Sequence, residues 1–336
     1  ALNFFLCDKL TRIGGFIDFD DYGWTIRGSS LDPIKVPAIK EQYTDEQIDT
    51  QQVALIIETL VKTNKRYKEV AKLTKASFCL TSDLLKDFLP KNCEPIIVNN
   101  VLTAVARITE EFYPKSLEDE FDSKVLDIED YNYKNVIHGK NVFIGENVKI
   151  GTNCSIGHNT IIEKNVHIGN NCKIGSNSII RNSIIRNNVS ILDNCIIGKK
   201  GFGFFPNKKK NLRYPHIGIV IINEGCEIGC GATIDRGSMS NTEIGKNTFL
   251  DNQIHVAHNV KIGDNCIIAG QVGFAGSTTI GNNVMIGGQA GISGHLKIGD
   301  NVQIGGGSGV IKNIPDNAKV MGYPAKDIRN FLKENK

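Results

Sequence analysis

Residues 244–310 read IGKNTFLDNQIHVAHNVKIGDNCIIAGQVGFAGSTTIGNNVMIGGQAGISGHLKIGDNVQIGGGSGV, and an apolar residue occupies every sixth position of this stretch. The series is Ile244, Leu250, Val256, Ile262, Ile268, Phe274, Ile280, Ile286, Ile292, Ile298, Ile304 and Val310. Six residues of an α-helix turn through about 600°, so the series would drift around a helix instead of forming one face. In extended chain, six is an even number and all members point to the same side. The stretch therefore predicts short strands that each bury one apolar residue.

The same period begins well before this stretch. Isoleucines recur every six residues from Ile144 to Ile180, and after a slip of one residue the spacing resumes from Ile185 to Ile197. Gly or Asn flanks most of these positions, and both residue types favour tight turns with positive φ. Only a coil buries every sixth residue and leaves the intervening polar pairs in water. We therefore expect a mainly β protein with a parallel β-helix over residues 136–314.

The flanking segments lack the repeat. Residues 1–113 predict a small α/β domain, with short strands at 76–81 and 94–99 and helices at 63–75 and 100–114. The acidic stretch 114–135 is interpreted as a linker, and the tail 315–336 as one short amphipathic helix.

The composition narrows the class of protein. At 336 residues the chain is long enough for two domains, and a net charge of +3 favours neither nucleic acid nor more than peripheral membrane contact. The nine cysteines contain no C-x2-C pair, and no apolar run approaches the 18 or so residues of a membrane span. We expect reduced structural thiols, no metal site and a cytoplasmic location.

One histidine has a spatial partner in the repeat. Gly276 follows His258 by 18 residues, one coil of three six-residue sides, and His295 follows by about two coils. Stacked coils would place an imidazole, an open backbone N–H and a second imidazole along one strip about 10 Å long. Acyl transfer needs such a set, because a base must activate the nucleophile and a donor must stabilise the oxyanion.

Two further segments have unusual composition. Residues 198–218 interrupt the repeat with GFGFF, which includes Phe202 and Phe204, followed by Lys208–Lys210. Aromatic surface beside lysines suits a phosphate-bearing ligand, although a solvated basic loop is the simpler interpretation. Residues 305–309 are almost all glycine, which indicates either simple turns or a groove for a long acyl chain.

Four motifs together carry a resemblance: GFGF (201–204), ATIDRG (232–237), DNQIHVAHNVKIGDN (251–265) and GQAGISGH (288–295). They resemble the UDP-3-O-(3-hydroxyacyl)glucosamine N-acyltransferases of lipid A biosynthesis. The resemblance implies a left-handed coil and transfer of a 3-hydroxyacyl chain to the 2-amino group of a UDP-linked glucosamine. The chain would be delivered on the phosphopantetheine of acyl carrier protein, with no cofactor bound to the enzyme. It also implies a homotrimer, in which a neighbouring subunit closes each site.

The resemblance also implies roles for single residues. His258 would be the general base, Gly276 the oxyanion donor and His295 a second active-site histidine. Asp251 would orient the base, and Asn252 would hold the substrate.

The uracil-binding end of the implied site departs from the family pattern, and the contact with the carrier protein lies outside the four motifs. The N-terminal domain would bind uracil through Asn64 and Tyr67, although Val61 and Lys65 stand where the family has Phe and Pro. An acidic carrier protein could meet the basic residues of the tail and of the inserted loop. These are Lys326, Arg329, Lys333 and Lys208–Lys210.

Three alternative functions remain open at this point. The related O-acyltransferase of the same pathway has a TIHRG motif, whereas this chain has Asp235 at that position. An acetyl-CoA-dependent sugar N-acetyltransferase would need no long acyl groove. A purely structural β-helix would need no histidine at position 258.

Overall fold

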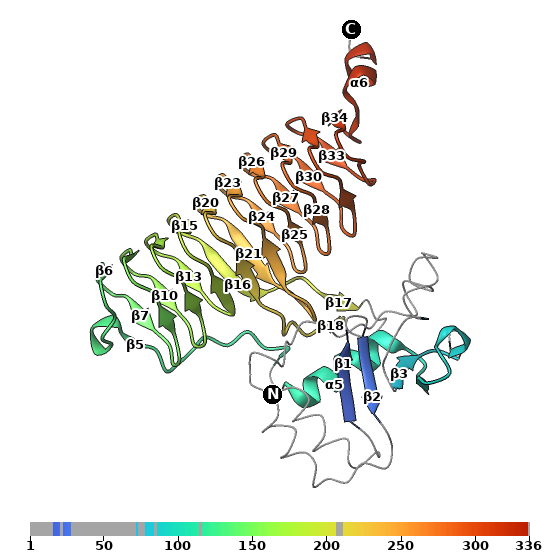
Figure 1. Ribbon diagram of the computed structural model, residues 1–336, viewed down its shortest axis with the longest axis horizontal. Coiled ribbons are helices and arrows are strands. Elements are labelled where there is room, and N and C mark those ends of the chain that lie inside the picture. Colours follow the sequence, from blue (N-terminus) through green and yellow to red (C-terminus); the bar gives the residue numbers. More distant parts are fainter. Residues whose placement is uncertain are drawn as a thin grey trace. The chain divides into compact units, whose positions relative to one another are not determined.

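The computed structural model describes residues 16–20, 23–27, 72, 78–83, 86–113, 116–205 and 211–334 (Figure 1). These residues fall into two compact units, one built from residues 1–118 with 204–215 and the other from 119–203 with 216–336. Each unit has its own strands and its own contacts. No helix in the described ranges is both long and apolar enough to cross a membrane.

The first unit contains helices and short strands, as expected. The antiparallel pair β1 (Phe16–Asp20) and β2 (Gly23–Arg27) precedes the parallel pair β3 (Phe78–Thr81) and β4 (Glu94–Ile97), and η1 (Lys86–Phe88) connects the latter two. The helix α5 (Val101–Phe112) follows, and the Asn100 side chain caps it by accepting from the Thr103 N–H. The strands at 76–81 and 94–99 and the helix at 100–114 are thus confirmed. The helix predicted at 63–75 lies outside the described residues, apart from residue 72.

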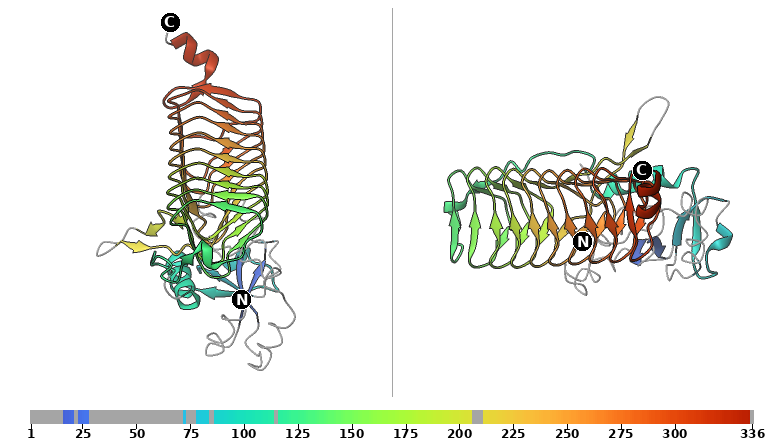
Figure 2. Two further views of the ribbon diagram at one scale, coloured as in Figure 1. Left: turned by 90° about the vertical axis from the view of Figure 1, so that its left-hand side faces the viewer. Right: turned by 90° about the horizontal axis from the view of Figure 1, so that it is seen from above.

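The second unit is the predicted left-handed parallel β-helix of hexapeptide repeats, whose coils stack one on another in Figure 2. Three sheets form its sides. The ten-stranded sheet contains β5 (Leu126–Asp127), β7 (Phe143–Ile144), β10 (Ile161–Ile162), β13 (Ile179–Ile180), β16 (Ile196–Lys200), β21 (Thr233–Arg236), β24 (His255–Val256), β27 (Gly273–Phe274), β30 (Gly291–Ile292) and β33 (Gly309–Val310).

The other two sides are built in the same way. The eight-stranded sheet contains β8 (Lys149–Ile150), β11 (His167–Ile168), β14 (Ser183–Ile185), β19 (Val220–Ile222), β22 (Thr242–Ile244), β25 (Lys261–Ile262), β28 (Thr279–Ile280) and β31 (Lys297–Ile298). The eleven-stranded sheet contains β6 (Val136–His138), β9 (Cys154–Ile156), β12 (Lys173–Ile174), β15 (Ser190–Ile191), β20 (Glu227–Ile228), β23 (Phe249–Leu250), β26 (Ile267–Ile268), β29 (Met285–Ile286), β32 (Gln303–Ile304), β34 (Lys319–Met321) and β35 (Lys326–Asp327). The predicted C-terminal helix is present as α6 (Ile328–Glu334).

The core of the coil consists of the sixth-position residues. Ile144, Ile162, Ile180, Val256 and Phe274 are completely buried, and each stacks on the equivalent residue of the next coil. Burying one such side chain contributes roughly 1.5–3 kcal/mol, so the column of side chains stabilises the coil without any helix.

Glycine and asparagine have separate tasks at the corners. The positive φ belongs mainly to Asn, as at Asn147 and Asn165. The glycines that follow many of the strands provide room instead: a Cβ at Gly145 would lie 2.3 Å from the backbone nitrogen of Lys164 in the next coil. Tight stacking of coils, and not backbone conformation, therefore requires these glycines.

The unit boundaries differ from the predicted ones in two places. The segment interpreted as a linker packs on the first coil from residue 119 onward: β5 pairs with β7, and Ile128 in η2 (Ile128–Asp130) is buried in the core. The hydroxyl of Tyr131 also donates to the Ile144 carbonyl. Residues 204–215 form β17 (Phe204–Phe205) and β18 (Leu212–Arg213), an antiparallel pair grouped with the first unit. Long-range contacts of this kind cannot be predicted from the six-residue period, because the residues that make them lie outside it.

Candidate active site

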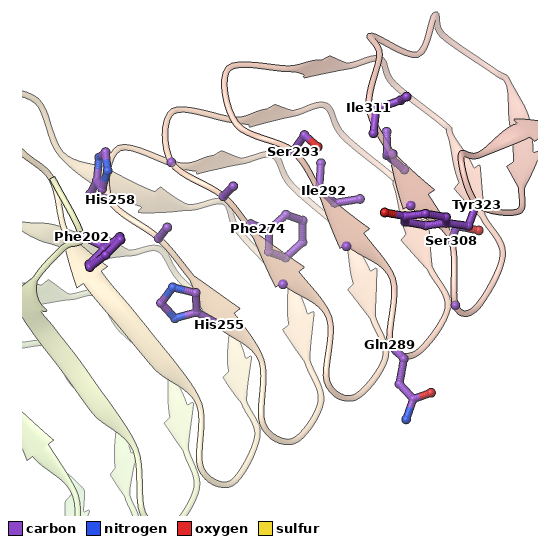
Figure 3. A pocket seen from close by; sticks show the side chains of 18 residues that line it. Phe202, His255, His258, Phe274, Gln289, Ile292, Ser293, Ser308, Ile311 and Tyr323 are labelled. Atoms are coloured by element: carbon purple, nitrogen blue, oxygen red, sulfur yellow. The ribbon is translucent and has the colours of Figure 1, made fainter. Parts of the chain in front are cut away.

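A groove of about 720 Å³ runs along the outer face of the ten-stranded sheet (Figure 3). Its floor is formed by the outward positions of the last strands, which are in register: His255, Gly273, Gly291 and Gly309. A Cβ at Gly273 or Gly291 would meet nothing within 4 Å, so these two glycines leave open space above the sheet. Rungs stack about 4.8 Å apart, which makes the channel from residue 255 to residue 309 about 14 Å long.

The two ends of the groove differ in chemistry. His255, His258 and the exposed ring of Phe202 lie at one end in Figure 3, and Tyr323 and Ile311 lie at the other. The Tyr323 ring covers Gly309 so closely that a Cβ there would lie 2.1 Å from Cδ2. The groove is thus polar at the histidine end and closed by an aromatic ring at the far end.

His258 is half-buried at the corner after β24, and its ring lies against Gly276 of the next coil. A Cβ at residue 276 would lie 2.7 Å from both Cε1 and Nε2 of His258. No backbone carbonyl of the described residues accepts a hydrogen bond from the Gly276 N–H. The 18-residue spacing therefore does bring the imidazole and an available backbone donor together.

Asn259 fixes the orientation of the His258 ring. The Asn259 Oδ1 accepts from the Ser238 N–H at 3.1 Å, and its Nδ2 donates to the Ser240 carbonyl at 3.0 Å, so the amide cannot be reversed. His258 Nδ1 lies 2.9 Å from the same Oδ1. Because Oδ1 can only accept, Nδ1 carries the proton and Nε2 has a free lone pair. His258 is therefore held in the form that can accept a proton at Nε2.

The surroundings of His258 keep it neutral. Burial lowers the pKa of His258 below the usual histidine value; the bond to Asn259 opposes this effect, and charge on His295 adds to it. A neutral imidazole at physiological pH is the state that a general base requires.

A second imidazole, which no sequence motif or spacing indicates, packs on His258. The ring of His216 is buried and meets the His258 ring edge-on, with centroids 5.1 Å apart. Gly201 lies beside both rings, since a Cβ there would be 2.9 Å from His216 Nε2 and 2.7 Å from the His258 Cβ. His216 lies within the interruption of the repeat at 198–218, so no spacing rule relates it to His258.

His295 lies at the next corner along the strip. It is exposed, has a φ of 60°, and its backbone N–H donates to the Gly276 carbonyl at 3.0 Å. His295 is thus close to the strip through its backbone, and its charge acts on His258.

Asp251 and Asn252 lie at a different corner of the same chain. Both follow β23 in the eleven-stranded sheet, whereas His258 precedes β25 in the eight-stranded sheet. The Asn252 side chain accepts from the Cys230 N–H at 2.7 Å, and Asp251 lies beside Gly270. One full side of the coil separates them from His258. Within one chain the group that orients the base is therefore Asn259, and Asp251 does not reach it.

The other predicted site residues do not all lie at the groove. Phe202 lines the groove, whereas Phe204 lies in β17 and is not one of the lining residues. Asn64, Tyr67 and the lysines at 208–210 lie outside the described residues. In the tail, Lys326 forms an ion pair with Glu334.

Asp235 and His255 form a pair that the repeat did not indicate. The Asp235 Oδ2 lies 3.9 Å from His255 Nε2, and the Thr233 Oγ1 lies 2.8 Å from His255 Nδ1. Burial, helped by the charge of Asp119, raises the pKa of Asp235 to about 7. Burial also lowers the pKa of His255.

Comparison with known proteins supports the fold and the class of repeat. Residues 241–276 and 277–312 each match the family described as bacterial transferase hexapeptide (six repeats). Residues 138–201 match a model described as the GMPPB C-terminal domain.

Curated relatives align with about a quarter of the chain. The chain is 44% identical over 84 residues to the UDP-3-O-acylglucosamine N-acyltransferase of Bradyrhizobium sp. (strain ORS 278), covering 25% of this chain and 24% of that protein. It is 39% identical over 79 residues to the enzyme of the same name from Azorhizobium caulinodans, covering 24% and 22%. The alignments thus span about a quarter of these relatives.

A solved structure extends the likeness in fold. The UDP-N-acetylglucosamine acyltransferase of Francisella novicida superposes with a TM-score of 0.53 at 24% identity, over 59% of this chain and 73% of that one.

Proposed function

We propose that this protein transfers a 3-hydroxyacyl chain from acyl carrier protein to the 2-amino group of a UDP-3-O-(3-hydroxyacyl)glucosamine. The observation that carries the proposal is the contact of His258 with Gly276 at the polar end of a groove whose floor consists largely of glycine. The similarity to proteins named UDP-3-O-acylglucosamine N-acyltransferase supports the choice of acceptor.

The reaction follows from the atoms at this end of the groove. The acceptor nitrogen attacks the thioester carbonyl, and His258 Nε2 takes a proton from that nitrogen. The Gly276 N–H would stabilise the negative charge on the carbonyl oxygen, a contribution of about 2.7–4 kcal/mol for one such donor in other enzymes. The C–S bond then breaks, and His258 returns its proton to the leaving thiolate of the phosphopantetheine.

The channel beyond His258 suits the acyl chain. Gly273 and Gly291 leave room for an extended hydrocarbon, and Tyr323 and Ile311 supply apolar surface at the far end. Of the glycines at 305–309, Gly307 and Gly309 line this groove, which supports the proposed acyl site.

Partners follow from the same geometry. The groove is open along the coil, and a neighbouring copy in a homotrimer would cover it. Such a copy could also bring Asp251 and Asn252 to a site whose base lies at another corner. The donor is a carrier-protein thioester, so we place the reaction in the cytoplasm. Arg329 and Lys333 in α6 are candidates for contact with the acidic carrier.

The decisive experiment measures acyl transfer from 3-hydroxyacyl carrier protein to UDP-3-O-(3-hydroxyacyl)glucosamine. We expect wild-type transfer and a loss of at least 100-fold in His258→Ala, the lower end of what one general base contributes. His167→Ala, on β11 of another side, is the matched control. UDP-N-acetylglucosamine as acceptor and acetyl-CoA as donor test the two rival reactions. Full activity of His258→Ala would remove this base from the mechanism.

A further inference from the structure

Asp235 and His255 lie where the acceptor would enter the groove. Thr233 of β21 is the register partner of His255 in β24, and Asp235 follows it on the same outer face. The Asp235 side chain is 14% exposed and that of His255 is 51% exposed. A buried carboxyl thus lies behind an imidazole that faces the groove next to His258.

The charged groups around the pair leave it able to exchange a proton. On the far side of Asp235, its register partner is Lys199 of β16, whose ammonium is 2.7 Å from Asp119 and so already has a carboxylate partner. On the other side, β27 presents the uncharged Gly273. Burial, and after it the charge of Asp119, raises the pKa of Asp235 to about 7. Burial, and after it the charge of His258, lowers the pKa of His255.

An amine acceptor that arrives as ammonium must lose two protons, and a single base accepts only one of them. An amine beside electron-withdrawing sugar oxygens is comparable to an α-amino group, which titrates at about 8, so it arrives mostly as ammonium at neutral pH. The ammonium has no lone pair and must lose one proton before attack. A second proton must leave after the C–N bond forms. His258 accounts for only one of these two protons.

We propose that His255 accepts the first proton from the ammonium form of the acceptor, with Asp235 as the positioning residue that stabilises the resulting imidazolium. The inference rests on the proposed N-acyl transfer. The Thr233 Oγ1 lies 2.8 Å from His255 Nδ1. In the tautomer whose Nδ1–H donates to this hydroxyl, the lone pair is on Nε2, the nitrogen nearer Asp235.

The steps balance without any further reactant. An N–H bond of the ammonium breaks and its proton moves to His255 Nε2. The freed lone pair forms the C–N bond to the thioester carbon, the C–S bond breaks, and His258 carries the second proton to the thiolate. The first proton then leaves to solvent from the exposed His255.

The test is the pH dependence of kcat/KM from pH 6 to 9.5 for wild type, His255→Gln and Asp235→Asn. Without the first acceptor, only the neutral amine reacts, and about one molecule in ten is neutral one pH unit below its pKa. We expect both variants to lose roughly tenfold near pH 7 and to rise with a midpoint at about 8, the pKa of the amine. Above pH 9 both should approach wild type. His167→Gln is the matched control and should follow wild type throughout.

The outcomes separate this inference from the proposed function. Variants whose profiles run parallel to wild type at every pH would show a structural role and overturn the relay, while acyl transfer itself stands. A wild-type protein that transfers nothing to the amine at any pH overturns both. A deficit confined to pH values below about 8 supports the relay.

Discussion

The imidazole of His258 lies directly against the backbone of Gly276, so that a Cβ on residue 276 would lie 2.7 Å from Nε2. The two residues are one coil apart, and the nitrogen with the free lone pair is the one nearest the glycine. The position of the His258 ring and its closeness to the Gly276 N–H therefore both depend on residue 276 being a glycine.

Gly276→Ala should displace the base without unfolding the coil. Residue 276 does not need a positive φ, so alanine fits the backbone, but its methyl group would push the His258 ring out of place. A shift of about 1 Å near reacting groups can cost about 100-fold in rate, and we expect a loss of that size in kcat. Gly288→Ala is the control, because a Cβ at residue 288 would come no closer than 3.2 Å to any atom beyond its chain neighbours, the nearest being the Gly270 carbonyl oxygen. Equal rates for both variants would contradict the proposed contact.

His258 should titrate below the ordinary value of about 6.5. Burial lowers its pKa, so the neutral base persists to a more acidic pH than in an exposed histidine. The hydrogen bond to Asn259 acts in the other direction, and Asn259→Ala should therefore lower the pKa further. Titration of the imidazole C–H resonances by NMR, assigned with His258→Gln, measures both values. A midpoint above 6.5 in the wild type would be inconsistent with this burial.

Gly291→Leu should shorten the acyl chain that the protein accepts. The new side chain enters open space on the groove floor, whereas Gly309→Met would first collide with Tyr323. Each methylene that can no longer be buried costs about 0.8 kcal/mol, or roughly fourfold in kcat/KM. Donors of graded chain length, assayed with wild type, Gly291→Leu and the control Gly291→Ala, provide the measurement. An unchanged length preference in both Gly291→Leu and Gly309→Met would remove the acyl chain from this groove.

Asp235→Asn should stabilise the fold at alkaline pH. The folded carboxyl has a pKa of about 7, above the 3.8 of the unfolded chain, so the folded state holds the proton more tightly. Raising the pH from about 4 to 7 therefore destabilises the wild type but not the amide variant. At roughly 1.4 kcal/mol per pKa unit, we expect a difference of about 2–4 kcal/mol at pH 8.5 and little at pH 4. Denaturant unfolding at both pH values measures the two free energies of unfolding, with the exposed Asp130→Asn as control. A variant Asp235→Asn that is less stable than wild type at pH 8.5 would contradict the prediction.

Arg181→Met should be strongly destabilising. Arg181 is buried between Glu163 and Asp119, and its removal leaves the buried Glu163 carboxylate without the guanidinium that pairs with it. Breaking a buried ion pair costs about 3–5 kcal/mol. Burial already raises the Glu163 pKa, so the loss should be smaller at pH 5, where the carboxyl can take up a proton.

Two further variants complete this test. Lys261→Met removes the more exposed pair with Glu243 and should cost at most about 1 kcal/mol. The double variant Glu163→Gln with Arg181→Met should recover most of the stability. If the double variant is no more stable than Arg181→Met, the loss comes from packing and not from the unpaired charge.

The sequence by itself determined the coil and the strip. A period of six decides which side chains point inward, and an 18-residue spacing decides which corners stack, so Gly276 could be placed beside His258 in advance. Only the tertiary structure decided the partners that come from outside the period. His216 lies within an interruption, and Asp235 meets His255 across two coils that are separated in sequence by the irregular turn at 237–241. Asp251 shares the chain but lies at another corner. In a coil the period converts spacing in sequence into distance along one strip, whereas contacts across interruptions depend on how the inserted chain folds back.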